Sequence, residues 1–400
     1  MKGVVSILLL FLLAPLPLAA ELLSRSELGG SLKSFDLFVD QLPDDSGAGL
    51  LSSGRFRLDA TGRLLASFDF EISLEQQLLW SDPPELVSLP RNTGNRLIDA
   101  EKSWNRGGRT EAQLQLDRFN LRGELAGIRW SIGRQAIGFG RISLFSPLDV
   151  IAPFAPDALD VDVRPGVDAV KLVRYFGLGG QLGGLVVFGD QPRRNSYLLS
   201  FGENLGNLDL LLLTGTLRDR PILGVGLAGE LGPLGLKGEL SYYRGTEVGR
   251  PGGDLREAFV IAALEGWYRF DNGLVLIAEY FYNGPGSNAP QKYPQVATSA
   301  PLQEGLSFLL SRHYLLFGPS YVLHPLVTLN GLLIHNLQDH SSLLRPQLAI
   351  SLADNLQLDL FWVFARGRRS KVDPLSGFVL PRSEFGTISD SGGLLLRWYF

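Results

Sequence analysis

Alternation of apolar and polar residues with a period of two runs along most of this chain and limits it to β-structure. In the run from Leu64 to Trp80, even-numbered residues are apolar as far as Leu74, and odd-numbered residues from Ser67 to Gln77 are polar. Strands this long are uncommon in soluble sheets, whereas a strand that crosses a bilayer needs about 9–11 residues. The pattern therefore predicts an all-β fold: a transmembrane antiparallel up-and-down β-barrel with lipid outside and water inside.

Short turns and longer loops alternate between the predicted strands. Gly, Asn and Asp mark short reversals at residues 60–62, 123–125, 177–180 and 271–273. Longer connections, among them 81–108 and 138–165, lie between such turns. Counting hairpins predicts about 18 strands, within a range of about 16 to 20, with both ends of the chain on the side of the short turns.

The first 20 residues have the pattern of a secretory signal peptide. Lys2 precedes an apolar run from Val4 to Leu13, and the segment ends at Ala19 and Ala20. A membrane anchor is the alternative, but the run is short for a spanning helix and no basic residues follow it. We predict a cleaved signal peptide over 1–20 and a single barrel domain over 21–400. The chain has no cysteine, and a closed barrel needs no disulfides.

Composition and motifs argue against most other functions. The net charge of −4 is too mild to favour nucleic acid as a partner. The four histidines show no metal-ligand spacing, and Gly138-Phe139-Gly140 does not open a nucleotide-binding loop. We predict that the protein is not an enzyme and has no metal and no cofactor. A membrane-embedded hydrolase using His335 and a nearby serine such as Ser341 is the least favoured alternative.

Residues 128–170 contain the most distinctive strings of the chain. They are Gly133-Arg134-Gln135, Ser146-Pro147-Leu148-Asp149 and Arg164-Pro165-Gly166-Val167-Asp168-Ala169. This succession resembles one in uncharacterised porin-like outer-membrane barrels of Gram-negative bacteria, loosely akin to the alginate-export type. The resemblance covers about a tenth of the chain and implies a bacterial outer-membrane location, without specifying a substrate.

The carboxy-terminal strand points to the same class. One face is apolar and the other carries Arg397 and Tyr399. The apolar face consists of Leu394, Leu396, Trp398 and Phe400. This ending resembles the closing strand of bacterial outer-membrane barrels, in which it serves as the signal for the barrel assembly machinery.

The connection over 138–165 is a candidate pore-constricting loop. Pro147, Pro153, Pro156 and Pro165 stiffen it, and its apolar residues include Phe145 and Phe154. A stiff, partly apolar loop can fold into the barrel and narrow the pore, or pack on the outer rim; the sequence leaves both arrangements open.

Charged residues near this loop are candidates for lining the pore. Arginines on neighbouring strands predict a basic ladder, faced by acids of an adjacent strand and of the loop. The candidates are Arg118, Arg122, Arg129, Arg134, Asp69, Glu71, Glu75, Asp149, Asp157, Asp160, Asp162 and Arg164. Structural ion pairs between the wall and the loop are the alternative role, and a weak calcium site at Asp157, Asp160 and Asp162 is a further one.

These features favour a channel through which small hydrophilic solutes diffuse, with anions suggested by the arginines. The alternative is a barrel that forms a sleeve around a partner protein, such as an electron-transfer or export component. The expected partners are outer-membrane lipid, the barrel assembly machinery, small hydrophilic solutes and, as an open question, further copies of the chain, but no nucleic acid.

Overall fold

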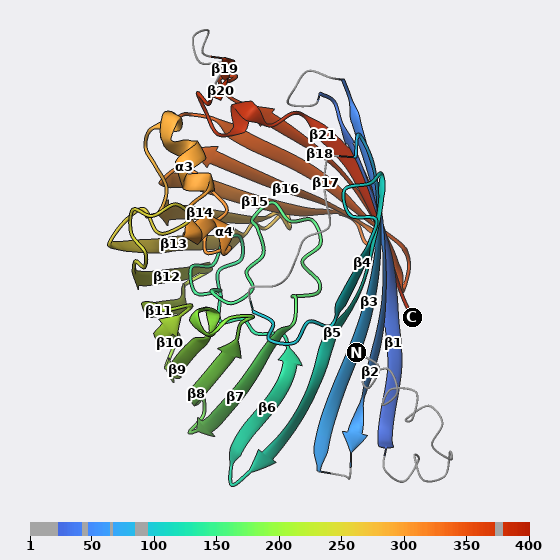
Figure 1. Ribbon diagram of the computed structural model, residues 1–400, viewed down its shortest axis with the longest axis vertical. Coiled ribbons are helices and arrows are strands. Elements are labelled where there is room, and N and C mark those ends of the chain that lie inside the picture. The colour runs from blue at the N-terminus through green and yellow to red at the C-terminus, as the bar shows by residue number, and fades with distance from the viewer. Residues whose placement is uncertain (1–22, 42–46, 65–66, 85–94, 373–378) are drawn as a thin grey trace.

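The computed structural model describes residues 23–41, 47–64, 67–84, 95–372 and 379–400. The predicted signal peptide lies outside this part of the chain. The described residues form a closed antiparallel barrel of 18 strands, as predicted (Figure 1). Its strands are β1 (Leu23–Val39), β2 (Gly49–Leu64), β3 (Phe68–Asp82), β5 (Thr110–Leu125), β6 (Ile128–Gln135), β7 (Val167–Phe176), β8 (Gly180–Phe188), β9 (Ser196–Leu205), β10 (Leu208–Leu217), β11 (Arg220–Leu231), β12 (Leu234–Arg244), β13 (Ala258–Arg269), β14 (Val275–Asn283), β15 (His313–His324), β16 (Val327–Asn336), β17 (Ser342–Ala353), β18 (Leu356–Arg366) and β21 (Ser391–Tyr399).

The barrel closes where the first strand meets the last. β21 pairs with β18 on one side and with β1 on the other, in a register that runs from Ser31 opposite Tyr399 to Val39 opposite Ser391. A short strand, β4 (Glu101–Trp104), lies against the upper part of β5, beyond the region where β6 pairs with that strand. β4 therefore continues the wall beyond the end of β6, and β6 is the shortest strand of the barrel.

The remaining elements lie in the loops. The short helices are α3 (Tyr293–Ala297) and α4 (Ala300–Gln303), and three-residue 3₁₀ turns occur at η1 (Pro192–Arg194), η2 (Pro290–Lys292) and η3 (Phe385–Thr387). β19 (Lys371–Val372) and β20 (Val379–Leu380) form a separate small hairpin. Within the described ranges, no helix is both long enough and apolar enough to cross a membrane.

The two faces of the wall have opposite polarity. Leu182, Leu199 and Leu223 are each more than half exposed on the outside. On the inside, charged side chains such as Glu75 and Asp359 are buried. The alternation read from the sequence corresponds to this division, because successive side chains of a strand point to opposite faces.

Two predicted turns are misplaced, and glycine packing explains both. β2 continues to Leu64, so the turn predicted at 60–62 is wrong and the run from Leu64 to Trp80 begins before the reversal. Gly62 lies in the strand opposite Phe70, whose ring would be 2.7 Å from any added Cβ. Gly123 similarly accommodates Trp130, and the chain turns instead at Ala126 and Gly127, with φ of 51° and 74°.

Candidate functional site

Residues 138–165, which join β6 to β7, pass through the interior of the barrel (Figure 1). Phe145 of this segment packs on Phe281 of β14 with ring centroids 4.3 Å apart, and on Phe308 of a neighbouring loop at 5.9 Å. Ile137 and Ile151 are buried in the same cluster. Part of the lumen is therefore an apolar core, and only the remainder can hold water.

Three glutamates on adjacent strands bind the first half of this loop. Glu239 of β12, Glu265 of β13 and Glu279 of β14 are buried on the inner face, and Glu265 lies directly opposite Glu279. Most of the hydrogen bonds that they accept come from backbone N–H groups of the loop. The donors are Arg141 (2.6 Å), Ile142 (3.2 Å) and Leu148 (3.1 Å) to Glu239, Ser143 (2.6 Å) to Glu265, and Phe145 (3.2 Å) to Glu279. We call these three residues the glutamate rack.

The second half of the loop contacts the wall around β1 and β21. Asp160 lies 2.8 Å from Lys33, and Asp162 lies 2.9 Å from the same ammonium. The Tyr399 hydroxyl donates to Asp162 at 2.6 Å, and Arg397 lies 3.7 Å from it. Burial would raise the pKa of Asp162, but the bonds from Tyr399 and Lys33 and the charges of Lys33 and Arg397 hold it below its usual value.

Other charged residues of the loop bind partners within the loop, or contact the barrel wall through a backbone carbonyl. Arg164 forms an ion pair with Asp149, donates to the carbonyl of Ala152 at 2.6 Å and stacks on Phe154 at 5.1 Å. Burial raises the pKa of Asp149 despite the neighbouring Arg164. Asp157 accepts a bond from Arg345 through its backbone carbonyl.

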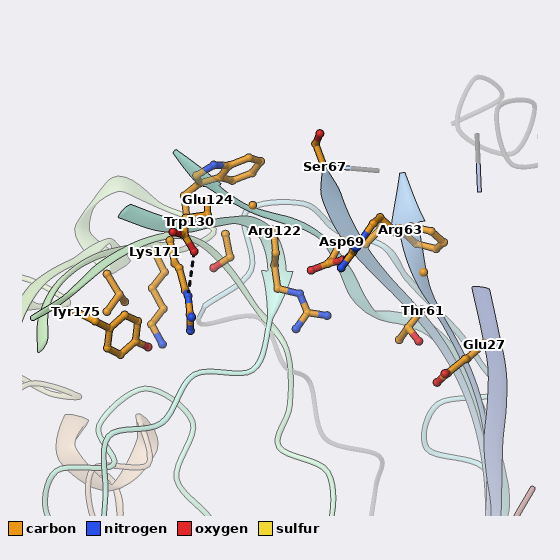
Figure 2. A pocket seen from close by; sticks show the side chains of 16 residues that line it. Glu27, Thr61, Arg63, Ser67, Asp69, Arg122, Glu124, Trp130, Lys171 and Tyr175 are labelled. Carbon is orange, nitrogen blue, oxygen red and sulfur yellow. Dashed lines mark hydrogen bonds and ion pairs between the residues drawn. The ribbon is translucent and has the colours of Figure 1, made fainter. Parts of the chain in front are cut away.

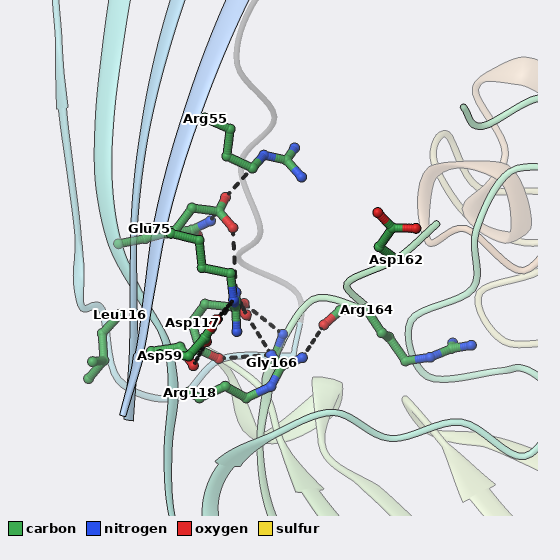
Figure 3. Close-up of polar contacts among 12 residues, drawn as sticks. Arg55, Asp59, Glu75, Leu116, Asp117, Arg118, Asp162, Arg164 and Gly166 are labelled. Carbon is green, nitrogen blue, oxygen red and sulfur yellow. Dashed lines mark hydrogen bonds and ion pairs between the residues drawn. The ribbon is translucent and has the colours of Figure 1, made fainter. Parts of the chain in front are cut away.

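A buried cluster of arginines surrounds Asp117 (Figure 3). A bulge in β5 leaves this residue without a partner on β3. Its carboxylate lies 2.6 Å from Arg57, 3.3 Å from Arg96 and 2.6 Å from Arg118, and it accepts the N–H of Gly166 at 2.9 Å. The cluster joins β2, β5 and the end of the loop, so its arginines act mainly as ties within the barrel.

The predicted ladder is only partly assembled. Arg118 and Arg122 both approach Glu71, at 3.7 and 3.6 Å. Arg134 has a different carboxylate partner: it pairs with Asp168 at 2.7 Å and donates to a backbone carbonyl in the segment before β4. Glu75 lies near Arg55 and Arg57, at 3.6 and 3.5 Å, and Asp69 pairs with Arg63 at 3.2 Å.

A cavity of about 750 Å³ opens at the end of the barrel that carries the short turns (Figure 2). Four cationic side chains (Arg63, Arg122, Arg129 and Lys171), three acidic ones (Glu27, Asp69 and Glu124) and Tyr175 are among the residues that line it. Arg122 and Lys171 are both register partners of Ser131, so one row across three strands carries two cations. Arg129 lies over the ring of Tyr175 at 4.9 Å and 3.4 Å from Glu124. Lys171 has no ion-pair partner within the described residues. We call this region the basic vestibule.

Several of these residues were not among the candidates predicted from the sequence. The principal ones are Asp117, Lys33, Arg57, Lys171, Glu239, Glu265 and Glu279. A signal for Asp117 was present: the apolar alternation passes through Leu114 and Leu116 and resumes at Phe119 and Leu121, a phase shift that indicates a bulge. For the glutamate rack the sequence shows only inward-facing acids on three strands, without the loop that binds them.

No protein-family model matches the chain, and no curated protein is similar to it in sequence. Solved structures of outer-membrane porins are similar in fold. A BenF-like porin from Pseudomonas fluorescens Pf-5 superposes with a TM-score of 0.56 at 12% identity, over 94% of this chain and 98% of the porin. OccAB2 from Acinetobacter baumannii gives 0.57 at 12% identity, over 95% and 99% of the two chains. OccD3 (OpdP) from Pseudomonas aeruginosa gives 0.53 at 10% identity, over 95% and 92%.

These similarities, together with the closed barrel, define the class: the protein has a porin-like transmembrane β-barrel fold. The predicted resemblance to porin-like barrels is confirmed at this level. The looser link to the alginate-export type stays a prediction.

Proposed function

We propose that the protein is an outer-membrane channel for small hydrophilic solutes and that it favours anions. The observation that carries the preference is the basic vestibule, where Lys171 has no ion-pair partner among the described residues and Arg122 and Arg129 have carboxylates only at 3.6 and 3.4 Å. The structure from Pseudomonas fluorescens with this fold is named as a porin, which supports the channel function.

The charges inside the barrel support diffusion through a hydrated path. The walls of a narrow aqueous pore concentrate ions of the opposite sign, because low-dielectric walls focus the field of fixed charges. The loop over 138–165 occupies part of the lumen and is the proposed constriction. A solute leaving the constriction would meet the row of Arg122 and Lys171 before reaching the end with the short turns.

Reversal potentials across a planar bilayer test the proposal. In a KCl gradient, the wild-type channel should favour chloride, and Lys171→Gln should reduce that preference by removing the unpaired cation. Arg174→Gln is the matched control, since Arg174 lies three residues along β7, is exposed and does not line the vestibule. A wild-type channel that favours potassium would reject the anion preference, equal selectivity in both variants would reject the role of Lys171, and a folded barrel without ion conductance would reject the channel.

The two alternatives receive less support. A sleeve needs a vacant lumen, whereas the loop and its apolar core occupy part of this one. The hydrolase has one observation in its favour: Nδ1 of His335 lies 2.8 Å from Oγ of Ser342. No described residue bonds to the other ring nitrogen, and a catalytic dyad needs such an orienting group. We therefore propose a channel without enzymatic activity; its assembly machinery, bound lipid and oligomeric state stay predictions.

A further inference from the structure

The seam between β1 and β21 brings two cations face to face. Lys33 and Arg397 are direct register partners across this seam. Both side chains point into the barrel, and only 4% and 9% of their surfaces are exposed. Like charges directly opposite each other destabilise a strand pair, and burial increases their repulsion. The two strands that must meet to close the barrel therefore repel each other at this position.

Asp162 of the interior loop compensates that repulsion. Its carboxylate lies 2.9 Å from Lys33 on β1, accepts the Tyr399 hydroxyl of β21 at 2.6 Å and lies 3.7 Å from Arg397. Among the described residues, it is the carboxylate that contacts both strands of the seam. Asp359 of β18 also binds Arg397, at 2.8 Å, but it does not reach β1.

Asp160 provides an internal comparison. It lies two residues earlier in the same loop and contacts the same lysine, at 2.8 Å. Its second partner is Arg55 of β2, at 3.3 Å, and β2 is already joined to β1 by the chain. Asp160 thus holds the loop to the wall without bridging the seam, and Asp162 does both.

We infer that the interior loop has a second function in assembly: Asp162 neutralises the facing cations Lys33 and Arg397, so that the barrel seals with the loop already inside. Closure of a barrel joins the two ends of the chain, which carry the largest sequence separation and form their contacts late. The loop is anchored on other strands, and its carboxylate lowers the repulsion between Lys33 and Arg397 when β1 pairs with β21. This role concerns assembly and does not depend on which solute, if any, the channel passes.

Refolding of purified protein into detergent micelles or liposomes tests the role. The fraction of the compact, heat-modifiable form is followed on unheated SDS gels. Asp162→Asn should slow its appearance by about fivefold or more, a factor in keeping with the loss of one partly buried charge contact. Asp160→Asn should refold at close to the wild-type rate, although it removes the same charge from the same loop.

A double variant separates charge compensation from simple anchoring of the loop. If Asp162 acts by neutralising the facing cations, Lys33→Gln in the Asp162→Asn background should restore most of the lost rate, because one of the repelling charges is gone. If Asp162 only anchors the loop, the double variant should be at least as slow as Asp162→Asn. Tyr399→Phe removes one seam contact without changing charge and should give a smaller defect.

Hydrogen exchange gives a second readout in the folded state. In Asp162→Asn, amides of β1 and β21 should exchange faster, while those of β10 to β13 should not change. If Asp162→Asn yields no folded barrel, folding of the Asp162→Asn/Lys33→Gln variant still supports the inference. Equal refolding of the Asp162 and Asp160 variants, or failure of Lys33→Gln to restore folding, would overturn it.

Discussion

At the scale of single residues, a bulge in β5 decides the chemistry of the lumen. It places Asp117 and Arg118 side by side on the inner face, where strict alternation would send one of them into lipid. The outer face still alternates, with Leu116 before the bulge and Phe119 after it. One added residue thus supplies the carboxylate that three arginines share.

Replacing Asp117 by Asn should strongly destabilise the barrel. Arg57, Arg96 and Arg118 would lose their shared counter-ion while staying buried, and breaking a buried ion pair typically costs about 3–5 kcal/mol. Urea unfolding in liposomes measures the loss. Asp69→Asn is the control, because its pair with Arg63 is about half exposed and should contribute about 0–1 kcal/mol.

Glu384 should make the loop network around it sensitive to pH. It accepts bonds from Tyr314, Asn336 and the N–H of Leu310, and Asp339 lies nearby. Burial raises the pKa of Glu384 from 4.5 to about 7. The closed network therefore binds a proton that an opened loop releases. The contribution of this bound proton to the stability of the network is complete below about pH 4.3 and is lost as the pH rises towards 7.

Thermal melting at pH 5 and pH 8 checks this expectation. The wild type should melt at a higher temperature at pH 5, and Glu384→Gln should lose most of the difference, because a neutral amide has no proton to release. An unchanged pH dependence in Glu384→Gln would assign the effect to other groups.

At the scale of elements, the glutamate rack and the interior loop form one unit. Glu265 accepts bonds from both the N–H and the hydroxyl of Ser143, at 2.6 and 3.1 Å, and pairs with Lys237 at 2.8 Å. Glu239 and Glu279 hold the residues on either side. The position of the loop is thus set by three neighbouring strands together, which gives a proposed constriction a rigid support.

Glu265→Gln should loosen the loop and change the current through a single channel. The amide replaces one acceptor oxygen by a donor that faces the N–H of Ser143, and it removes the ion pair with Lys237. We expect noisier open-channel current and a changed conductance in single-channel recordings. Glu230→Gln, at an exposed position of β11, should record like the wild type; the same noise in both variants would contradict a specific role for Glu265.

At the scale of the whole molecule, the period-two alternation predicted the barrel, and counting hairpins predicted about 18 strands, both of which are confirmed. Turn positions were harder to predict from the sequence. Gly62 and Gly123 are of a residue type that is typical of turns, but they lie within strands, where the missing side chain leaves room for an aromatic ring. The candidate site was predicted only in part. Acids and arginines on neighbouring strands could be paired from alternation, as for Glu71 and Arg122. Contacts such as Asp162 with Lys33 depend on the path of a long loop, which no local pattern encodes.

The opposite polarity of the two faces of the wall predicts how the whole molecule behaves in water. Because apolar side chains cover the outside and charged ones lie inside, the protein should be extracted from membranes only with detergent. Its far-UV circular dichroism should be dominated by β-structure. Material that stays in solution without detergent would contradict the transmembrane barrel.

The glutamate rack binds the interior loop mainly through backbone N–H groups of the loop. Peptide N–H groups are common to all amino acids except proline, so these hydrogen bonds depend little on the exposed side chains of residues 141–148, whereas buried ones such as Phe145 are fixed by packing. Mutation can therefore vary the side chains that this stretch presents to passing solutes while the path of the loop is kept. Evolution of solute preference and retention of the scaffold are, in this barrel, largely separate problems.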